Sequence, residues 1–109
     1  MAYDAGLAER ILDSLGEREG LEPKKMFGGV GYMLRGNMSV GVHGDDLIVR
    51  VGPARYDEAL ARPHARPFDL TGRPMKGWIW VGQEGFEDDA DLDAWVQMGV
   101  DFALSLPPK

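Results

Sequence analysis

The chain lacks cysteine altogether, which excludes disulfide bonds, thiolate zinc sites and cysteine nucleophiles. It also lacks any apolar run near the roughly 20 residues that a membrane-spanning helix needs, so we expect no membrane association. Residues 1–7 have neither the basic start nor the apolar stretch of a signal peptide, which predicts a cytoplasmic protein. A length of 109 residues allows one hydrophobic core, so we expect a single domain over residues 1–109.

Residues that commonly carry catalysis are scarce, and their sequence context does not match a catalytic pattern. The two histidines, His43 and His64, lack a His-Glu-x-x-His arrangement, and none of the three serines lies in a Gly-x-Ser-x-Gly elbow. We therefore expect a protein that is not an enzyme, with no catalytic residue, no metal and no cofactor. A hydrolase or transferase that uses one of the histidines remains an alternative.

Two segments resemble ligand sites in composition only. The glycines at 28, 29 and 31 lack the Lys-Ser/Thr pair of a phosphate loop and lie within a predicted strand, so we interpret them as a place of close backbone packing. The acidic residues between 84 and 93 lack the central glycine and terminal glutamate of an EF-hand loop. We interpret them as helix-capping and surface charges.

Positive charge is scarce at both ends of the chain and concentrated in the middle. The net charge is −6; residues 1–49 carry five Lys/Arg and eight Asp/Glu, residues 50–76 six and three, and residues 77–109 one and seven. The negative total argues against direct nucleic-acid binding, because attraction to phosphates dominates that affinity. Two interpretations of the middle segment stay open: ordinary solvated side chains, or a basic patch that contacts nucleic acid. The basic residues are Arg50, Arg55, Arg62, Arg66, Arg73 and Lys76.

The first half of the sequence predicts one helix followed by a meander of three strands. Apolar residues recur at helical spacing over residues 7–15, with Asp4 as the N-cap. Pro23 marks the connection into the first strand, and Gly36 with Asn37 predicts a hairpin turn after it. The predicted strands are residues 25–35, 38–42 and 47–51.

The second half predicts a short helix, two strands and a final helix. Pro53 suits the first turn of the short helix, and Pro63 ends it. Aromatic and β-branched residues favour a strand over residues 76–81. Asp88 or Asp89 caps the final helix, whose apolar residues form one stripe. The remaining predicted features are an edge strand at 66–69 and a turn at 70–72.

The order α-β-β-β-α-β-β-α, without a βαβ crossover, predicts a two-layer α+β fold. We expect a mostly antiparallel five-stranded sheet with the helices on one face. The strands at 25–35 and 78–81 are apolar on both sides, whereas helices on one face cover only one side. Something must therefore cover the second face: a second copy of the chain, another protein, or residues 62–75 folded over it.

Several short segments, in their order and spacing, resemble those of the TfoX N-terminal domain family, named for regulators of bacterial competence. The resemblance covers nearly the whole chain. Its first segment is the family motif Met26-Phe27-Gly28-Gly29. The other matching positions are Gly36-Asn37-Met38, Leu47-Ile48-Val49-Arg50-Val51, Phe68, Met75 with the aromatic strand after it, Leu92 and Trp95.

The resemblance implies a fold similar to that of secretion chaperones, in which sheets and helices support dimers and partner binding. Competence regulators of the family carry a second, C-terminal domain of small helices, whereas this sequence stops at Lys109. The segment from Gly72 to Trp78 also resembles a stand-alone branch. We therefore expect a stand-alone, single-domain member: a cytoplasmic binding or adaptor domain that acts through protein–protein contacts, as a homodimer or with another protein. The family's link to transcriptional control also implies the alternative, a transcription-related regulator that contacts nucleic acid through the basic segment 50–76.

Five residues are candidates for contact with a partner or a small anionic ligand. Arginine grips carboxylate and phosphate groups with its planar fork and stacks on aromatic rings. Basic and aromatic side chains that are close in the sequence are therefore the expected binding residues. They are Arg50, Arg73, Lys76, Trp78 and Trp80.

Overall fold

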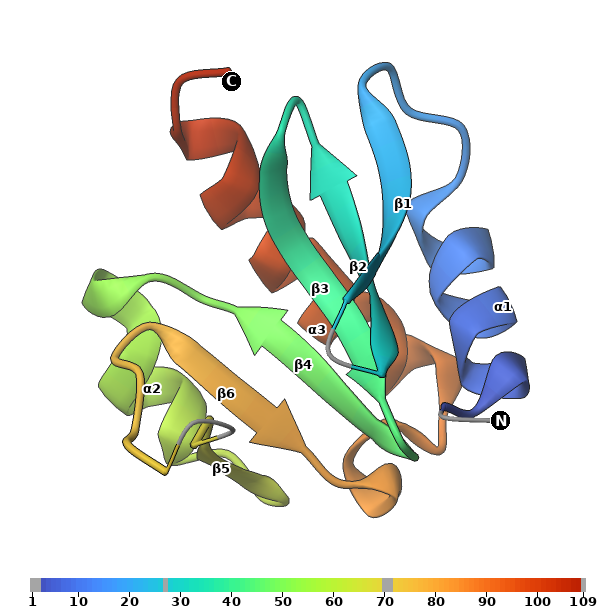
Figure 1. The fold of residues 1–109 in the computed structure, drawn as a ribbon. Helices are drawn as coiled ribbons and strands as arrows, with labels where there is room; N and C mark the ends of the chain where they lie inside the picture. Colours follow the sequence, from blue (N-terminus) through green and yellow to red (C-terminus); the bar gives the residue numbers. More distant parts are fainter. Residues whose placement is uncertain (1–2, 27, 70–71, 109) are drawn as a thin grey trace.

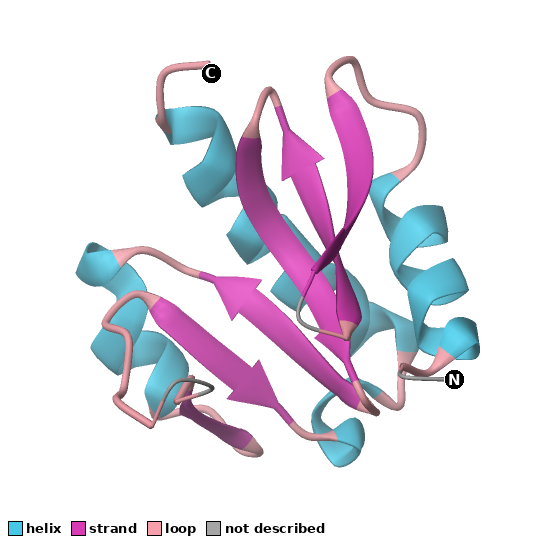
Figure 2. Cartoon of the chain, in the orientation of Figure 1, coloured by secondary structure: helices cyan, strands magenta, loops and turns pink. Residues whose placement is uncertain are grey.

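The computed structural model describes residues 3–26, 28–69 and 72–108. Its helices and strands follow the order α1, β1, β2, β3, β4, α2, β5, β6 and α3, with short 3-10 helices before α2 and α3 (Figure 1; Figure 2). The strands form one antiparallel sheet of six strands in the order β1-β2-β3-β4-β6-β5. The fold is α+β, as the sequence predicts, with one strand more than the five expected.

The first helix, α1 (Ala5–Leu15), begins where the sequence predicts. The Asp4 carboxylate accepts hydrogen bonds from the backbone N–H groups of Gly6 and Leu7, at 2.8 and 3.2 Å. These bonds satisfy two of the donors that the first turn of a helix leaves unpaired. The predicted N-cap is therefore confirmed.

The additional strand arises because the segment predicted as one strand, residues 25–35, contains a hairpin. β1 (Leu21–Met26) and β2 (Gly29–Leu34) pair antiparallel up to the residues that flank the turn. Gly28 has φ of 76°, which permits so tight a reversal. The prediction for Pro23 was also wrong, since it lies within β1 rather than in a connection. β1 is an edge strand, where a missing N–H donor is tolerated.

The meander continues with β3 (Asn37–His43) and β4 (Asp46–Arg50). β3 and β4 pair only as far as Val40 with Val49, so the start of β3 and the end of β4 diverge. In Figure 1 the C-terminal half of α3 lies behind these diverging ends. The separation allows the ring of Phe102 from α3 to contact Arg50 at the end of β4.

The second half matches the predicted order, with shorter elements. The helix between the prolines at 53 and 63 is short, and the edge strand begins one residue earlier than expected and is three residues long. Residues 70 and 71 of the predicted turn lie outside the described residues. The elements are the 3-10 helix Pro53–Arg55, α2 (Tyr56–Leu60), β5 (Ala65–Pro67), β6 (Trp78–Val81), the 3-10 helix Gln83–Phe86 and α3 (Asp89–Ser105).

The helices pack on one face of the sheet, and the main core lies between the two layers. α3 contacts β2, β3 and β4, α1 packs against α3 and β3, and α2 covers β5 and β6. The Tyr32 hydroxyl donates to the Ala8 carbonyl at 3.2 Å, which ties β2 to α1, and burial raises the pKa of Tyr32. The largest side chains that are fully buried are Tyr32, Ile11, Leu15, Leu34, Leu47, Ile79 and Leu92.

Candidate functional site

The second face of the sheet, which the helices leave open, carries a small apolar cluster. Its buried members are Phe68, Trp80, Ile48 and Met38, and its half-buried members are Met33 and Trp78. The ring of Phe68, from the connection after β5, lies with its centroid 4.8 Å from that of Trp80 and 6.0 Å from that of Trp78. Of the three covers that the sequence allows, the structure shows part of the third, because Phe68 of the segment 62–75 packs on this face.

Each of the three tryptophans has an arginine over its ring. Such pairs are attractive within about 6 Å and contribute roughly 0.5–1 kcal/mol at exposed sites. The pairs are Arg50 with Trp78, Arg62 with Trp95 and Arg66 with Trp80, at 5.0, 5.3 and 5.7 Å from Cζ to the ring centroid. The three arginines differ in their other contacts, and this difference identifies the candidate sites.

At one end of the second face, Arg66 is neutralised within the chain. Its Nη2 donates to Oδ2 of Asp46 at 2.7 Å. Trp80, beneath Arg66, donates from Nε1 to Oδ1 of Asp69 at 3.2 Å, and the His43 ring lies 5.5 Å from the Trp80 ring. The cation and both carboxylates at this end therefore have partners already.

At the opposite end, aromatic rings alone hold Arg50. Its Cζ lies 5.0 Å from the centroid of Trp78 and 5.1 Å from that of Phe102. Within residues 3–26, 28–69 and 72–108, its guanidinium takes part in no salt bridge. No side-chain nitrogen in this part of the chain is both fully buried and unpaired, so the Arg50 nitrogens, on a half-buried residue, keep some exposure to solvent. Burial lowers the pKa of Arg50 from its ordinary value, yet a guanidinium remains protonated at neutral pH.

The ends of β4 and β6 position the Arg50 side chain. Arg50 is the cross-strand neighbour of Trp78, so both side chains project from the same face. Phe102 reaches Arg50 from α3 because β3 and β4 have diverged at this point (Figure 1). Gly52 is required here, since it has φ of 85° and a Cβ would overlap the Phe102 ring. The Gly77 carbonyl accepts backbone hydrogen bonds from the two residues after β4, at 2.8 and 3.0 Å.

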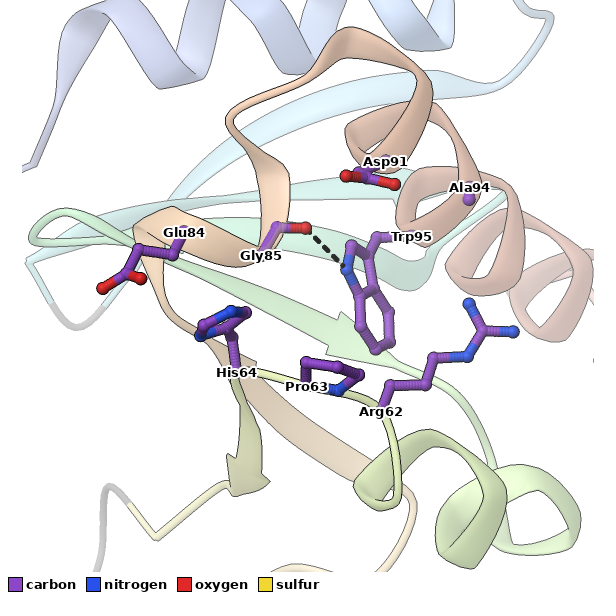
Figure 3. Close-up of a pocket in the computed structure, with 8 residues that line it drawn as sticks. All are labelled: Arg62, Pro63, His64, Glu84, Gly85, Asp91, Ala94 and Trp95. Carbon is purple, nitrogen blue, oxygen red and sulfur yellow. Dashed lines mark hydrogen bonds between the residues drawn. The ribbon is translucent and has the colours of Figure 1, made fainter.

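A separate cleft of about 460 Å³ lies between the connection from α2 to β5, the 3-10 helix Gln83–Phe86 and α3 (Figure 3). Trp95 is buried at its floor and donates from Nε1 to the Gly85 carbonyl at 3.2 Å. The cleft shares no residue with the Arg50 end. The described residues that line it are Arg62, Pro63, His64, Glu84, Gly85, Asp91, Ala94 and Trp95.

The model of the TfoX N-terminal domain family matches residues 12–103, most of the chain. The chain belongs to the TfoX N-terminal domain family. Comparison with curated proteins gave no match, and comparison with solved structures gave none either. The similarity to secretion chaperones that the sequence resemblance implies therefore stays a prediction.

In this TfoX N-terminal domain, two of the five predicted binding residues are in contact with each other. Arg50 lies over Trp78, whereas Trp80 belongs to the paired end of the second face. Arg73 and Lys76 are exposed in the connection between β5 and β6, and no ion pair of the described residues includes them. The structure thus narrows the predicted site to Arg50 and Trp78, with Lys76 two residues before Trp78.

The family motif lies at the β1–β2 hairpin. Met26 ends β1, Gly28 lies in the turn and Gly29 begins β2, while Phe27 is outside the described residues. A Cβ at Gly29 would overlap the carbonyl oxygen of Val42 on β3. The interpretation of these glycines as a place of close backbone packing is confirmed at Gly29.

Sequence reasoning missed two groups of residues. It assigned Phe102 to the core stripe of the last helix, whereas the ring also contacts the Arg50 guanidinium. It gave Arg62 and His64 no joint role, although both line the cleft with Trp95. The one available signal was Gly52, a glycine directly after a strand that ends in Arg-Val, which indicates that another group approaches closely.

A membrane-spanning helix and a metal-binding cluster are both absent from residues 3–26, 28–69 and 72–108. None of the helices in this part of the chain combines the length and the hydropathy of a membrane span. Within the same residues, no three His, Asp or Glu side chains come together as ligands for a metal ion.

Proposed function

We propose that this TfoX N-terminal domain is a cytoplasmic, non-enzymatic binding domain that docks an acidic segment of another protein at the Arg50 end of the second face. One observation carries the proposal: the Arg50 guanidinium lies between the rings of Trp78 and Phe102, without a carboxylate partner among the described residues. Its nitrogens are not fully buried, and the two rings pack against it. A regulatory role through such contacts accords with membership of the family.

The chemistry of arginine favours a carboxylate at this position. A guanidinium presents several N–H donors in one plane, which match the two oxygens of a carboxylate. Because two rings already hold the side chain, little conformational entropy is lost on binding. Hydrogen bonds to charged groups contribute roughly 1.5–3 kcal/mol, so one such contact changes affinity about ten- to 100-fold.

The charges of the two layers also favour an acidic partner on the sheet side. The helices α1, α2 and α3 carry eight Asp/Glu and one Lys/Arg. The six strands together with residues 68–77 carry six Lys/Arg and three Asp/Glu. An acidic segment is therefore attracted toward the sheet and repelled from the helices, which orients its approach.

A second copy of the chain is the other partner that the sequence suggests. A symmetric dimer with its axis at Arg50 would bring that cation against its own copy, which like charges disfavour. The sheet edges are protected against strand addition, because β1 contains Pro23 and two lysines and β5 is three residues long and ends at Pro67. We therefore favour a different protein. Light scattering over a dilution series separates the two, since a constant dimer mass would support the homodimer instead.

Nucleic acid remains the alternative partner for the basic segment at 50–76. The structure divides its six cations: Arg55 and Arg66 are in ion pairs with carboxylates, and Arg62 lines the cleft. The other four, Arg62 included, are in no ion pair of the described residues, so pairing lowers the charge that the segment offers phosphates from six to four. Salt-dependent binding to duplex DNA that is lost in Arg50→Ala would favour this alternative.

The proposal is tested by site-specific photo-crosslinking in the source cell. A crosslinking amino acid replaces Met75, which is exposed near Trp78, and in a control protein it replaces Glu9 on the outer surface of α1. We expect a crosslinked protein from position 75 that is absent from position 9 and lost in the background of Arg50→Gln. Arg66→Gln is the control and should keep the product. A product that is present in Arg50→Gln as well as in Arg66→Gln would contradict the proposal.

A further inference from the structure

We propose that the cleft of Figure 3 binds a small extended zwitterion, a short peptide that carries a free ammonium group at one end and a free carboxylate at the other. This inference is independent of the proposed function, because the cleft shares no residue with the Arg50 end. Its volume of about 460 Å³ lies in the range of sites for small molecules. The chemistry of its walls selects the ligand.

Residues of both charge signs line the cleft and form no ion pair with one another. Arg62 lines it from the connection after α2, Glu84 from the 3-10 helix and Asp91 from the first turn of α3. Among the residues that the structure describes, no ion pair includes any of these three. Figure 3 places Arg62 and Glu84 at opposite ends of the cleft, with Trp95 and Gly85 between them.

The cleft is rigid on the side of the cation. The Trp95 indole is fixed by its hydrogen bond to the Gly85 carbonyl, and Arg62 lies over the ring with Cζ 5.3 Å from the centroid. The turn that carries Arg62 is held by backbone hydrogen bonds, from Ala65 N–H to the Arg62 carbonyl at 3.3 Å and from Gly82 N–H to the His64 carbonyl at 3.0 Å. A fixed guanidinium loses little freedom when it binds a carboxylate.

Ligands of one sign fit this site poorly. A simple anion would meet Arg62 but also the repulsion of Glu84 and Asp91, and a simple cation would meet the carboxylates together with Arg62. The face of Trp95 is already occupied by Arg62, so it is not available as a cage for an ammonium group. A zwitterion places its carboxylate at Arg62 and its ammonium at Glu84 or Asp91, which satisfies both ends.

The turn at the mouth of the cleft has an unusual backbone conformation. His64 has φ of 69°, one of two such non-glycine residues in the described chain. Gly85 lies close beneath it, because a Cβ there would come within 3.1 Å of the His64 Cβ. The conformation thus holds the imidazole at the edge of the cleft, where a ring nitrogen can hydrogen bond to a polar ligand.

The test is an NMR titration of the isotope-labelled protein with diglycine, triglycine and tetraglycine, each at up to about 10 mM, a range that detects millimolar dissociation constants. We expect at least one probe to shift the amide signals of residues 62–64 and 84–95 in a saturable way. N-acetylation and C-amidation of that probe should each weaken binding, because each removes one of its charges.

Substitutions then assign the two ends of the site. Arg62→Gln and Glu84→Gln should each weaken the best probe about tenfold or more, the effect of losing one hydrogen bond to a charged group. Arg55→Gln, on an arginine that pairs with Glu58 outside the cleft, serves as the matched control and should leave affinity unchanged. The proposal is overturned if no probe shifts these signals, or if the acetylated probe binds as well as the free one, which would indicate an anion site.

Discussion

Both ends of the second face contain an arginine over a tryptophan, but only one of the two arginines has a carboxylate partner among the described residues. At one end Arg66 lies over Trp80 and its guanidinium is paired with Asp46 at 2.7 Å. At the other end Arg50 lies between Trp78 and a second ring, and no carboxylate of the described residues is paired with it. The Arg66 guanidinium therefore has its anion within the chain, whereas the Arg50 guanidinium has none among the described residues and is the one that we propose binds an external carboxylate.

The difference is the reason why we propose recognition at the Arg50 end and a structural role alone for Arg66. A cation that is paired and stacked adds a small surface contribution to stability. A cation that is stacked but unpaired keeps a fixed direction and open donors, which is the condition for binding a carboxylate with little loss of entropy.

Phe68 connects the two ends, since its ring packs against both Trp78 and Trp80. Phe68→Ala should lower the free energy of unfolding by about 3 kcal/mol, because it removes a buried ring and uncovers the sheet. Urea denaturation measures the change. Phe68→Leu, which keeps most of the volume, should cost less than about 1.5 kcal/mol. Equal losses in both variants would show that the cover of the second face does not depend on this ring.

Gly52 sets the geometry of the Arg50 end alone. Gly52→Ala should destabilise the fold by about 2 kcal/mol, because the new Cβ overlaps the Phe102 ring and the residue has a positive φ. Gly44→Ala is the matched control: Gly44 also has a positive φ, but nothing lies within 4 Å of its added Cβ. The overlap is refuted as a cause if thermal unfolding shows the same loss in both variants.

Arg50→Gln should separate binding from stability. We expect the affinity for hexaglutamate, a carboxylate-rich probe, to fall about tenfold or more, while the free energy of unfolding changes by about 1 kcal/mol, the scale of the lost ring contacts. Fluorescence anisotropy of a labelled probe measures the affinity. Arg50→Lys should not restore it, since an ammonium cannot form the planar two-point contact. Full rescue by lysine would mean that charge alone is recognised.

Arg66→Gln should have the smallest effect. The pair with Asp46 is substantially exposed, so its loss should cost less than about 1 kcal/mol and disappear at high salt. A double-mutant cycle with Asp46→Asn, at low and high salt, measures the coupling. Probe affinity should stay within about twofold of the unmodified protein, which is well below the effect expected of one charged hydrogen bond. A large loss of affinity here would remove the distinction between the two ends.

The sequence predicted the fold class and the family because their signals are local and ordered. Helical spacing and the Asp4 cap located α1, and alternation located β3 and β4. The β1–β2 hairpin was missed because Pro23 and two lysines look unlike a strand, and only an edge position makes them suitable. Edge position follows from the strand order, which no single segment encodes.

The sequence predicted which types of residue form the candidate site, but only in part which of these residues lie together in the structure. Arg50 and Trp78 were expected to bind because they are basic and aromatic and near in sequence, and the strand register does bring them together. That Arg66 is paired while Arg50 is not depends on Asp46, twenty residues away along the chain. The part played by Phe102 depends on the divergence of β3 from β4, a property of the whole sheet.

One NMR experiment compares the two arginines and tests directly whether Arg50, and not Arg66, binds external carboxylates. The side-chain Nε–H signals of the arginines are followed by NMR while hexaglutamate is added. The account predicts that the Arg50 signal shifts and saturates while the Arg66 signal, already paired with Asp46, stays in place. Equal shifts of both signals, or a shift of Arg66 alone, would contradict the assignment of the Arg50 end as the binding site.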